Sequence, residues 1–158
     1  MELTGLVIAL FGAVVAIVGA GVGSSLGIGM VGTAANGLLA EEPEKFGTAL
    51  LLVAFLSTQG IYGFLTGFLA MMRLGVFTGT MLLPTVQQGF QILVACLPIA
   101  ITGFFTGIYE GQVCSSGIGV VAKHPEAVMK ALIFAAMIET YAVLGLITSV
   151  ILLFGVKL

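Results

Sequence analysis

The segment IFAAMIETYAVLGL, residues 133–146, decides the fold. It contains a single charged residue, Glu139, about twelve residues into an apolar stretch of about thirty. A helix of that length spans the hydrocarbon core of a bilayer, so Glu139 is expected near its middle. A carboxylate at that depth costs several kcal/mol unless it is neutralised or paired, which marks Glu139 as a functional residue. A purely structural polar contact between helices is the alternative.

The composition of the whole chain also indicates a membrane protein. Of its 158 residues, 59% are hydrophobic and 8% are charged, and the mean hydropathy is +1.25. Soluble domains carry about 25% charged residues, so a water-soluble fold is excluded. The net charge of −2 excludes a nucleic-acid partner held through phosphate neutralisation. The two cysteines, Cys96 and Cys114, lie in apolar stretches and are expected to be buried thiols.

Charged residues divide the chain into spans. Four apolar stretches lie between them, at residues 3–40, 46–72, 86–122 and 127–156. Each exceeds the ~20 residues that cross a bilayer as a helix, so we predict an all-α membrane protein with four transmembrane helices. Short connections make a first helical hairpin at 1–73, a connecting loop at 74–85 and a second hairpin at 86–158. The first stretch is longer than a secretory signal and lacks a basic start, so we expect a retained spanning helix.

The two predicted hairpins are related in sequence. A shift of 82 residues places Pro43 on Pro125 and makes twelve of forty-four positions identical between 29–72 and 111–154. An even number of helices separates the two copies, so both hairpins run in the same direction. This tandem, parallel duplication disfavours the inverted repeats that are typical of many secondary transporters.

Small residues recur at every fourth position in the first and third spans. They are Gly21, Ser25, Gly29, Thr33 and Gly37 in the first span, and Gly103, Gly107, Gly111, Ser115 and Gly119 in the third. This spacing keeps them on one helix face, where small residues let helix backbones approach closely. We predict a tight inner layer in which these helices lie side by side between many subunits. Generic packing within one chain is the alternative.

Polar residues interrupt the second and third spans. Phe55, Thr58, Gln59 and Tyr62 lie at spacings of three and four, so they share one helix face. The Gln59 amide needs a partner from another helix, because an unpaired buried amide is costly. Glu110, in GIYEGQV, is a second acidic residue in apolar surroundings, with a carboxylate that reaches the headgroup region as the alternative. Oxygen-only ligands of this kind suit a hard cation.

These features together resemble a known family, the duplicated four-helix proteolipids (c or K subunits) of V-type ATPases. The resemblance covers nearly the whole chain. Besides the two rows of small residues, it is carried by EEPEKFGTAL at 41–50, STQGIYGF at 57–64, GIYEGQV at 107–113 and KALIFAAMIETYAVLGL at 130–146. Glu139 falls on the family's ion-carrying glutamate, and Ser57 takes its place in the first repeat.

The resemblance implies a function and a set of partners. Identical subunits form a ring in the membrane, and ATP hydrolysis in partner subunits turns this ring past a membrane stator subunit. The chain itself is then a non-catalytic, ion-translocating subunit. Its turns at 41–45 and 123–126 are expected to face the cytoplasm and dock a central-stalk subunit. Membrane lipid is the other implied partner, and the bacterial plasma membrane is the implied location of this multi-pass protein.

Within that family, the polar residues resemble the sodium-pumping bacterial members more than the proton-pumping eukaryotic ones. The implied sodium ligands are Glu139, Thr58, Gln59, the backbone carbonyl of Phe55 and the side chain at Glu110, with Tyr62 hydrogen-bonded to Glu139. Glu110 departs from the family pattern, which has glutamine there. Two carboxylates around one monovalent ion leave a net negative site, so we expect one of the pair to be protonated when Na+ is bound.

Three other functions compete with a sodium-carrying rotor. A proton-translocating ring belongs to the same family, with H+ in place of Na+ as the transported ion. A small independent channel or transporter needs a hydrated path within one chain, for which polar residues are too few. A structural scaffold has no use for a carboxylate in mid-membrane.

Overall fold

The computed structural model describes residues 2–158, and every regular element in that range is helical. The elements are α1 (Glu2–Glu41), the 3-10 turn η1 (Pro43–Lys45), α2 (Phe46–Phe55), α3 (Thr58–Arg73), α4 (Val86–Lys123), the 3-10 turn η2 (Pro125–Ala127) and α5 (Val128–Gly155). When α2 and α3 are taken together as one span, these elements give four spans that are long and apolar enough to cross a membrane. The predicted all-α membrane class is confirmed.

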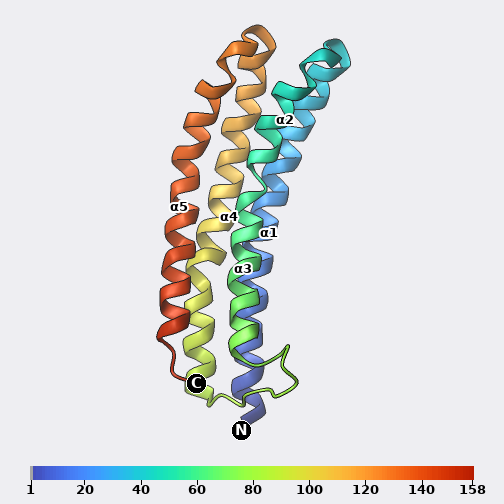
Figure 1. The fold of residues 1–158 in the computed structure, drawn as a ribbon. Coiled ribbons are helices and arrows are strands. Elements are labelled where there is room, and N and C mark those ends of the chain that lie inside the picture. Colours follow the sequence, from blue (N-terminus) through green and yellow to red (C-terminus); the bar gives the residue numbers. More distant parts are fainter. Residues whose placement is uncertain (1) are drawn as a thin grey trace.

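The four spans form two antiparallel hairpins that lie side by side (Figure 1). α1 and α4 run next to each other along the bundle, while α3 packs on α1 and α5 packs on α4. Both chain ends and the loop before α4 lie at one end of the bundle, and the two tight turns lie at the other. The hairpins therefore run in the same direction, as the duplication predicts.

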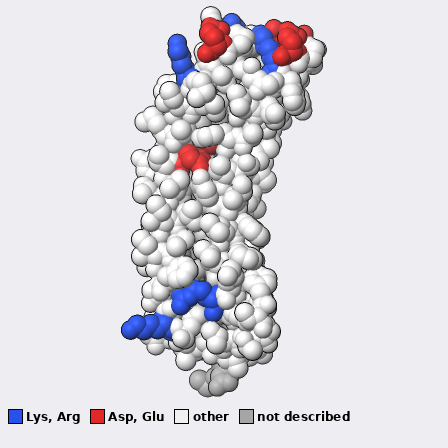
Figure 2. Space-filling model, in the orientation of Figure 1, with Lys and Arg blue, Asp and Glu red and all other residues white. Residues whose placement is uncertain are grey.

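Charged side chains gather at the two ends of the molecule (Figure 2). On the face shown, acidic and basic side chains lie together at the end with the tight turns, and basic side chains lie near the other end. The long surface between them is uncharged except for one small acidic spot about halfway along. This distribution fits a molecule whose middle lies in hydrocarbon and whose ends reach water.

α1 and α4 approach each other closely through glycines. A Cβ at Gly103 would lie 2.7 Å from the Ala20 Cβ, and a Cβ at Gly107 would lie 2.5 Å from the carbonyl carbon of Gly23. Gly111 likewise faces the backbone of Gly27. Real side chains do not tolerate such distances, so three members of the row in the third span hold α1 and α4 together within one chain.

The row of small residues in the first span has a different place. Ser25, Gly29, Thr33 and Gly37 are exposed, and Gly21 is half-buried. Apart from its chain neighbours and the nearby backbone of its own helix, a Cβ at Gly21, Gly29 or Gly37 would meet no atom of residues 2–158 within 4 Å. α1 instead contacts α4 through glycines on its opposite side, which include Gly23. Packing within one chain thus explains Gly103, Gly107 and Gly111 of the row in α4 and leaves the row in α1 without a neighbour.

The second span is broken, which corrects the prediction of one continuous helix over 46–72. α2 ends at Phe55, and α3 begins at Thr58. At the break, the amide of Ser57 bonds to the carbonyl of Ala54, three residues earlier, at 3.2 Å. Ser and Thr hydroxyls compete for the carbonyls that a continuous helix would use, and consecutive hydroxyl residues therefore interrupt this helix.

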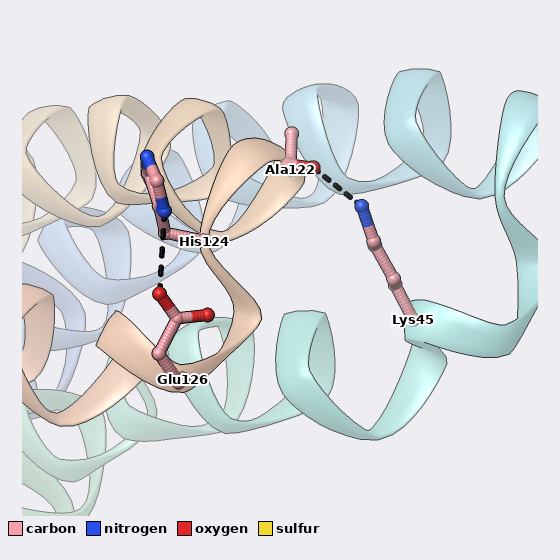
Figure 3. Close-up of polar contacts among 4 residues, drawn as sticks. All are labelled: Lys45, Ala122, His124 and Glu126. Atoms are coloured by element: carbon pink, nitrogen blue, oxygen red, sulfur yellow. Dashed lines mark hydrogen bonds and ion pairs between the residues drawn. The ribbon is translucent and has the colours of Figure 1, made fainter.

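Two basic side chains join the hairpins at opposite ends of the bundle. The Lys45 ammonium donates to the carbonyl of Ala122, near the end of α4 (Figure 3). The Arg73 guanidinium donates to the carbonyl of Leu153 and, at 2.7 Å, to that of Val156, at the end of α5. Cations at helix C-termini offset the helix dipole and satisfy the last carbonyls. Both contacts run from the first hairpin to the second and fix how the hairpins pair.

Candidate ion-binding site

Two carboxyl groups lie inside the bundle, one on each helix of the second hairpin. Glu110 belongs to α4 and Glu139 to α5, and Gln59 of α3 lies between them. Glu110 and Gln59 are fully buried, whereas Glu139 remains 9% exposed. Both carboxyl groups are far from the ends of α4 and α5, so this site lies well inside the membrane-spanning part of the bundle.

Side chains from α3 reach both carboxylates. The hydroxyl of Thr58 lies 2.9 Å from Oε2 of Glu139, and Nε2 of Gln59 lies 2.8 Å from the same oxygen. Nε2 of Gln59 also donates to Oε2 of Glu110. Four residues that the sequence predicts to share a site are therefore in contact, although they come from three different helices.

The site contains more acceptor oxygens than hydrogens to satisfy them. The Oε1 atoms of Gln59, Glu110 and Glu139 are buried and have no hydrogen-bond partner among residues 2–158. The Thr58 hydroxyl has one hydrogen but two acceptors within reach, because the carbonyl oxygen of Phe55 lies 3.1 Å away. Buried oxygens without partners cost free energy, so these atoms are suited to bind a cation or a proton. A ligand set made only of oxygens favours a hard cation.

The break between α2 and α3 brings a backbone carbonyl to the site. In a continuous helix, the Phe55 carbonyl would accept from the amide four residues later; here the Thr58 hydroxyl lies beside it. The next carbonyl, of Leu56, accepts from the Ser24 hydroxyl of α1 at 2.5 Å. Ser57 closes the turn by donating to the Ala54 carbonyl at 2.8 Å. Hydroxyl groups from two helices thus stabilise the opened backbone.

Ser24 is a supporting residue that the sequence does not predict. The sequence shows only two adjacent serines, Ser24 and Ser25, in a glycine-rich stretch, and it does not indicate which of them faces inward. In the structure Ser24 is buried against the break, while the neighbouring Ser25 is exposed and donates to the Val22 carbonyl of its own helix.

Tyr62 lies one helical turn beyond Thr58 and is partly buried. Its hydroxyl is near the Glu139 carboxylate. The hydrogen bonds that Glu139 accepts in the structure come from Thr58 and Gln59. The predicted bond between Tyr62 and Glu139 stays a prediction.

With this geometry in place, comparison with known proteins defines the class. The family model for the C subunit of ATP synthase matches the chain twice, at residues 11–70 and 93–152. The two matches are offset by the same 82 residues that relate the hairpins. The chain belongs to this family, in a form with two tandem copies.

Two relatives resemble the chain over nearly all of its length. It is 46% identical over 148 residues to the V-type sodium ATPase subunit K of Enterococcus hirae, a match that covers 94% of this chain and 91% of that protein. It is 37% identical over 151 residues to the A-type ATP synthase subunit K of Methanocaldococcus jannaschii, covering 96% of this chain and 64% of that longer protein.

Proposed function

We propose that this chain is a K-type rotor-ring subunit of a V-type sodium ATPase, and that it carries Na+ across the membrane at Glu139. It is an integral, multi-pass and non-catalytic subunit of a multi-subunit rotary complex, and its proposed location is a bacterial plasma membrane. The Enterococcus hirae relative, which is named as a sodium ATPase subunit and matches along nearly its whole length, supports this function. Each copy of the chain is one repeating unit of the ring. It consists of the hairpins 1–73 and 86–158, joined by residues 74–85.

The observation that carries this proposal is the surplus of buried oxygens around Glu139. A transferred proton needs one carboxylate and one hydrogen-bond partner, whereas Na+ needs several oxygens to replace its hydration shell. Thr58, Gln59 and the Phe55 carbonyl supply oxygens beyond the carboxylate, and Glu110 stands beside them. These five groups are the proposed ligands.

Glu110 holds a proton while Na+ is bound. Na+ and one carboxylate form a neutral pair, whereas two ionised carboxylates leave a negative charge that is costly in mid-membrane. Glu110 is fully buried and Glu139 is slightly exposed, which favours Glu139 as the ionised member. The Tyr62 hydroxyl donates to Glu139 and holds it turned inward when the site faces lipid.

Two partner proteins complete this function. A membrane stator exchanges ions with Glu139, whose residual exposure gives it access to the bundle surface. A central-stalk protein docks on the turns at 41–45 and 123–126. In the second turn, His124 and Glu126 contact each other at 3.2 Å (Figure 3) and remain exposed, so a partner has access to both.

Carbodiimide labelling tests the proposal. Carbodiimides react with protonated carboxyls in apolar sites, and mass spectrometry of the cleaved protein assigns the label to Glu139 or Glu110. Millimolar Na+ is expected to protect Glu139, and protection should weaken as pH falls and protons compete. Glu139→Gln should remove the label at position 139 and abolish transport while the ring still assembles. Normal transport by this variant, or labelling of Glu139 that ignores Na+ at every pH, would refute sodium transport at Glu139.

The second candidate is a proton-translocating ring. The observation that favours it is the pair of carboxyls joined by one Gln59 amide, which is able to share a proton without Na+. It predicts labelling of Glu139 that depends on pH and is unaffected by Na+, so the same experiment separates the two candidates.

A further inference from the structure

One side of α4 carries a row of large apolar side chains. Ile101, Phe105 and Tyr109 are each about half exposed, at 53%, 51% and 55%. The glycines of α4 that contact α1 lie two residues after each of them, and two residues turn an α-helix by about 200°. The large side chains therefore point away from α1 of the same chain.

The duplication provides a partner for this row. Within one chain, Gly107 of α4 contacts Gly23 of α1, and Gly111 contacts Gly27. Each residue of one repeat has its counterpart 82 positions away in the other repeat. When every residue is replaced by its counterpart, the contact of Gly107 with Gly23 becomes one of Ser25 with Phe105. The contact of Gly111 with Gly27 becomes one of Gly29 with Tyr109. The same shift turns the contact of Gly19 with Ala100 into one of Val18 with Ile101, and that of Gly12 with Leu93 into one of Phe11 with Val94.

All eight residues of the shifted contacts are exposed in the single chain. These contacts therefore cannot occur within one chain. They are available between the α4 of one copy and the α1 of another, in the arrangement that the two hairpins already adopt within each chain. Repetition of one such head-to-tail contact by rotation closes a ring.

We infer that Ile101, Phe105 and Tyr109 of one protomer pack on the Ser25 and Gly29 face of α1 in the next. This inference rests on the proposed rotor ring, and it defines which surfaces meet in it. The occupant of the exposed row of small residues in α1 is thus a second copy of this chain.

The two contacts of α1 then differ in kind. Towards its own α4, glycine meets glycine, and the backbones approach closely. Towards the neighbouring α4, Gly29 meets Tyr109 and Ser25 meets Phe105, so an aromatic ring lies between the two backbones. Neighbouring helices of the inner layer are therefore alternately close and wide apart, with the wide spacing at every boundary between chains.

Paired cysteines test this interface. In a background with Cys96→Ala and Cys114→Ala, Ser25→Cys is combined with Phe105→Cys and treated in the membrane with a short, thiol-specific bifunctional reagent. We expect a ladder of covalent oligomers on a denaturing gel. The matched control combines Ser25→Cys with Val94→Cys, which lies on the same face of α4 but eleven residues, or about 16 Å, from Phe105. The control should not form a ladder.

Native mass spectrometry of the cysteine variants before cross-linking shows whether a negative result concerns the interface or the ring itself. A large homo-oligomer together with the Ser25–Phe105 ladder supports the interface. A large homo-oligomer in which only the control pair links, or in which neither pair links, overturns the interface and leaves the rotor ring standing. A monomer overturns the rotor ring itself, and the interface with it.

Discussion

The Gln59 amide nitrogen lies 2.8 Å from Oε2 of Glu139 and also donates to Oε2 of Glu110, so one amide holds two buried carboxyl groups. Its own oxygen is left without a hydrogen-bond partner among residues 2–158. Gln59 therefore organises the two carboxyl groups and leaves its own oxygen free for the proposed ion.

Replacing Gln59 by alanine should weaken Na+ binding more than assembly. A hydrogen bond to a charged group is worth about 1.5–3 kcal/mol, which corresponds to roughly a tenfold to hundredfold change in an equilibrium constant. We expect the Na+ concentration for half-protection of Glu139 from carbodiimide to rise by that factor. Thr66→Ala is the control, because the Thr66 hydroxyl bonds only to the Tyr62 carbonyl of its own helix. Equal half-protection in both variants would contradict a role for Gln59 as ligand.

Glu110→Gln should keep Na+ protection of Glu139 but change its pH dependence. The amide resembles a protonated carboxyl in shape, and it leaves a single titrating group where two coupled groups stand. Half-protection measured across a pH series should therefore follow a simple competition between Na+ and one proton. Loss of protection at every pH would mean that Glu110 binds Na+ as an ionised carboxylate.

Ser24→Ala should loosen the break between α2 and α3. The substitution removes the only hydroxyl from α1 that donates to the Leu56 carbonyl, at a cost of about 1 kcal/mol. We expect a lower thermal midpoint and a modest rise in the Na+ concentration for half-protection. Ser116→Ala removes an exposed hydroxyl that bonds to its own helix and should change neither quantity. The role of Ser24 is wrong if both variants behave like the parent.

Arg73→Gln should weaken the pairing of the hairpins at the end opposite the tight turns. Arg73 donates to two carbonyls at the end of α5 and lies 5.4 Å from the centroid of the Phe154 ring. Loss of these contacts should lower the stability of the isolated protomer by about 1–3 kcal/mol. The measurement is thermal unfolding in detergent, with Lys157→Gln as an exposed basic control. Indistinguishable midpoints would show that the contact does not stabilise the pairing.

Gly29→Leu and Gly111→Leu should cause different defects, the first in assembly of the oligomer and the second in folding of the protomer. Gly111 faces the Gly27 backbone, so Gly111→Leu should prevent α1 and α4 from packing and leave little folded protein. Gly29 has open space around it in the single chain, so Gly29→Leu should give a folded protomer that does not oligomerise. Adding Tyr109→Ala should restore part of the oligomer, because it removes the side chain that would collide with the leucine.

Native mass spectrometry and circular dichroism distinguish these outcomes. Gly47→Leu is the control, since Gly47 is exposed near the tight turn and also has open space around it. An intact oligomer of Gly29→Leu would contradict this prediction. It would mean that the row of small residues in α1 faces lipid or a loosely packed interior instead of the next protomer.

Hydrophobicity and charge spacing were sufficient to predict the four spans and their pairing, and residue identities at a shift of 82 predicted the tandem duplication. These features depend only on where apolar runs begin and end, which the sequence states directly. The grouping of Thr58, Gln59, Glu110 and Glu139 was implied by the family resemblance, and it agrees with the need of polar groups inside a bilayer for one another.

The break after Phe55 could not be predicted from Ser57 and Thr58 alone, because a hydroxyl that Ser24 donates from another helix also stabilises it. The faces of α1 were also ambiguous, since small residues line both sides of this helix and periodicity does not choose between them. Pro98 is a third case: it lies inside α4, and the freed amide of Ile99 donates to the Ser149 hydroxyl oxygen of α5 at 3.0 Å. Such contacts between helices repair a local irregularity only after the chain has folded.

The first repeat has Ser57 where the second has Glu139, and this difference determines how many ions a rotor built from this chain moves per revolution. Each chain takes up the arc of two hairpins but, in the proposed function, has one ion-carrying glutamate, Glu139. For the same circumference, such a rotor moves half as many ions per revolution as one with an ion-carrying glutamate in every hairpin. The free energy of one revolution is then divided among fewer ions, so each ion is driven against a steeper gradient.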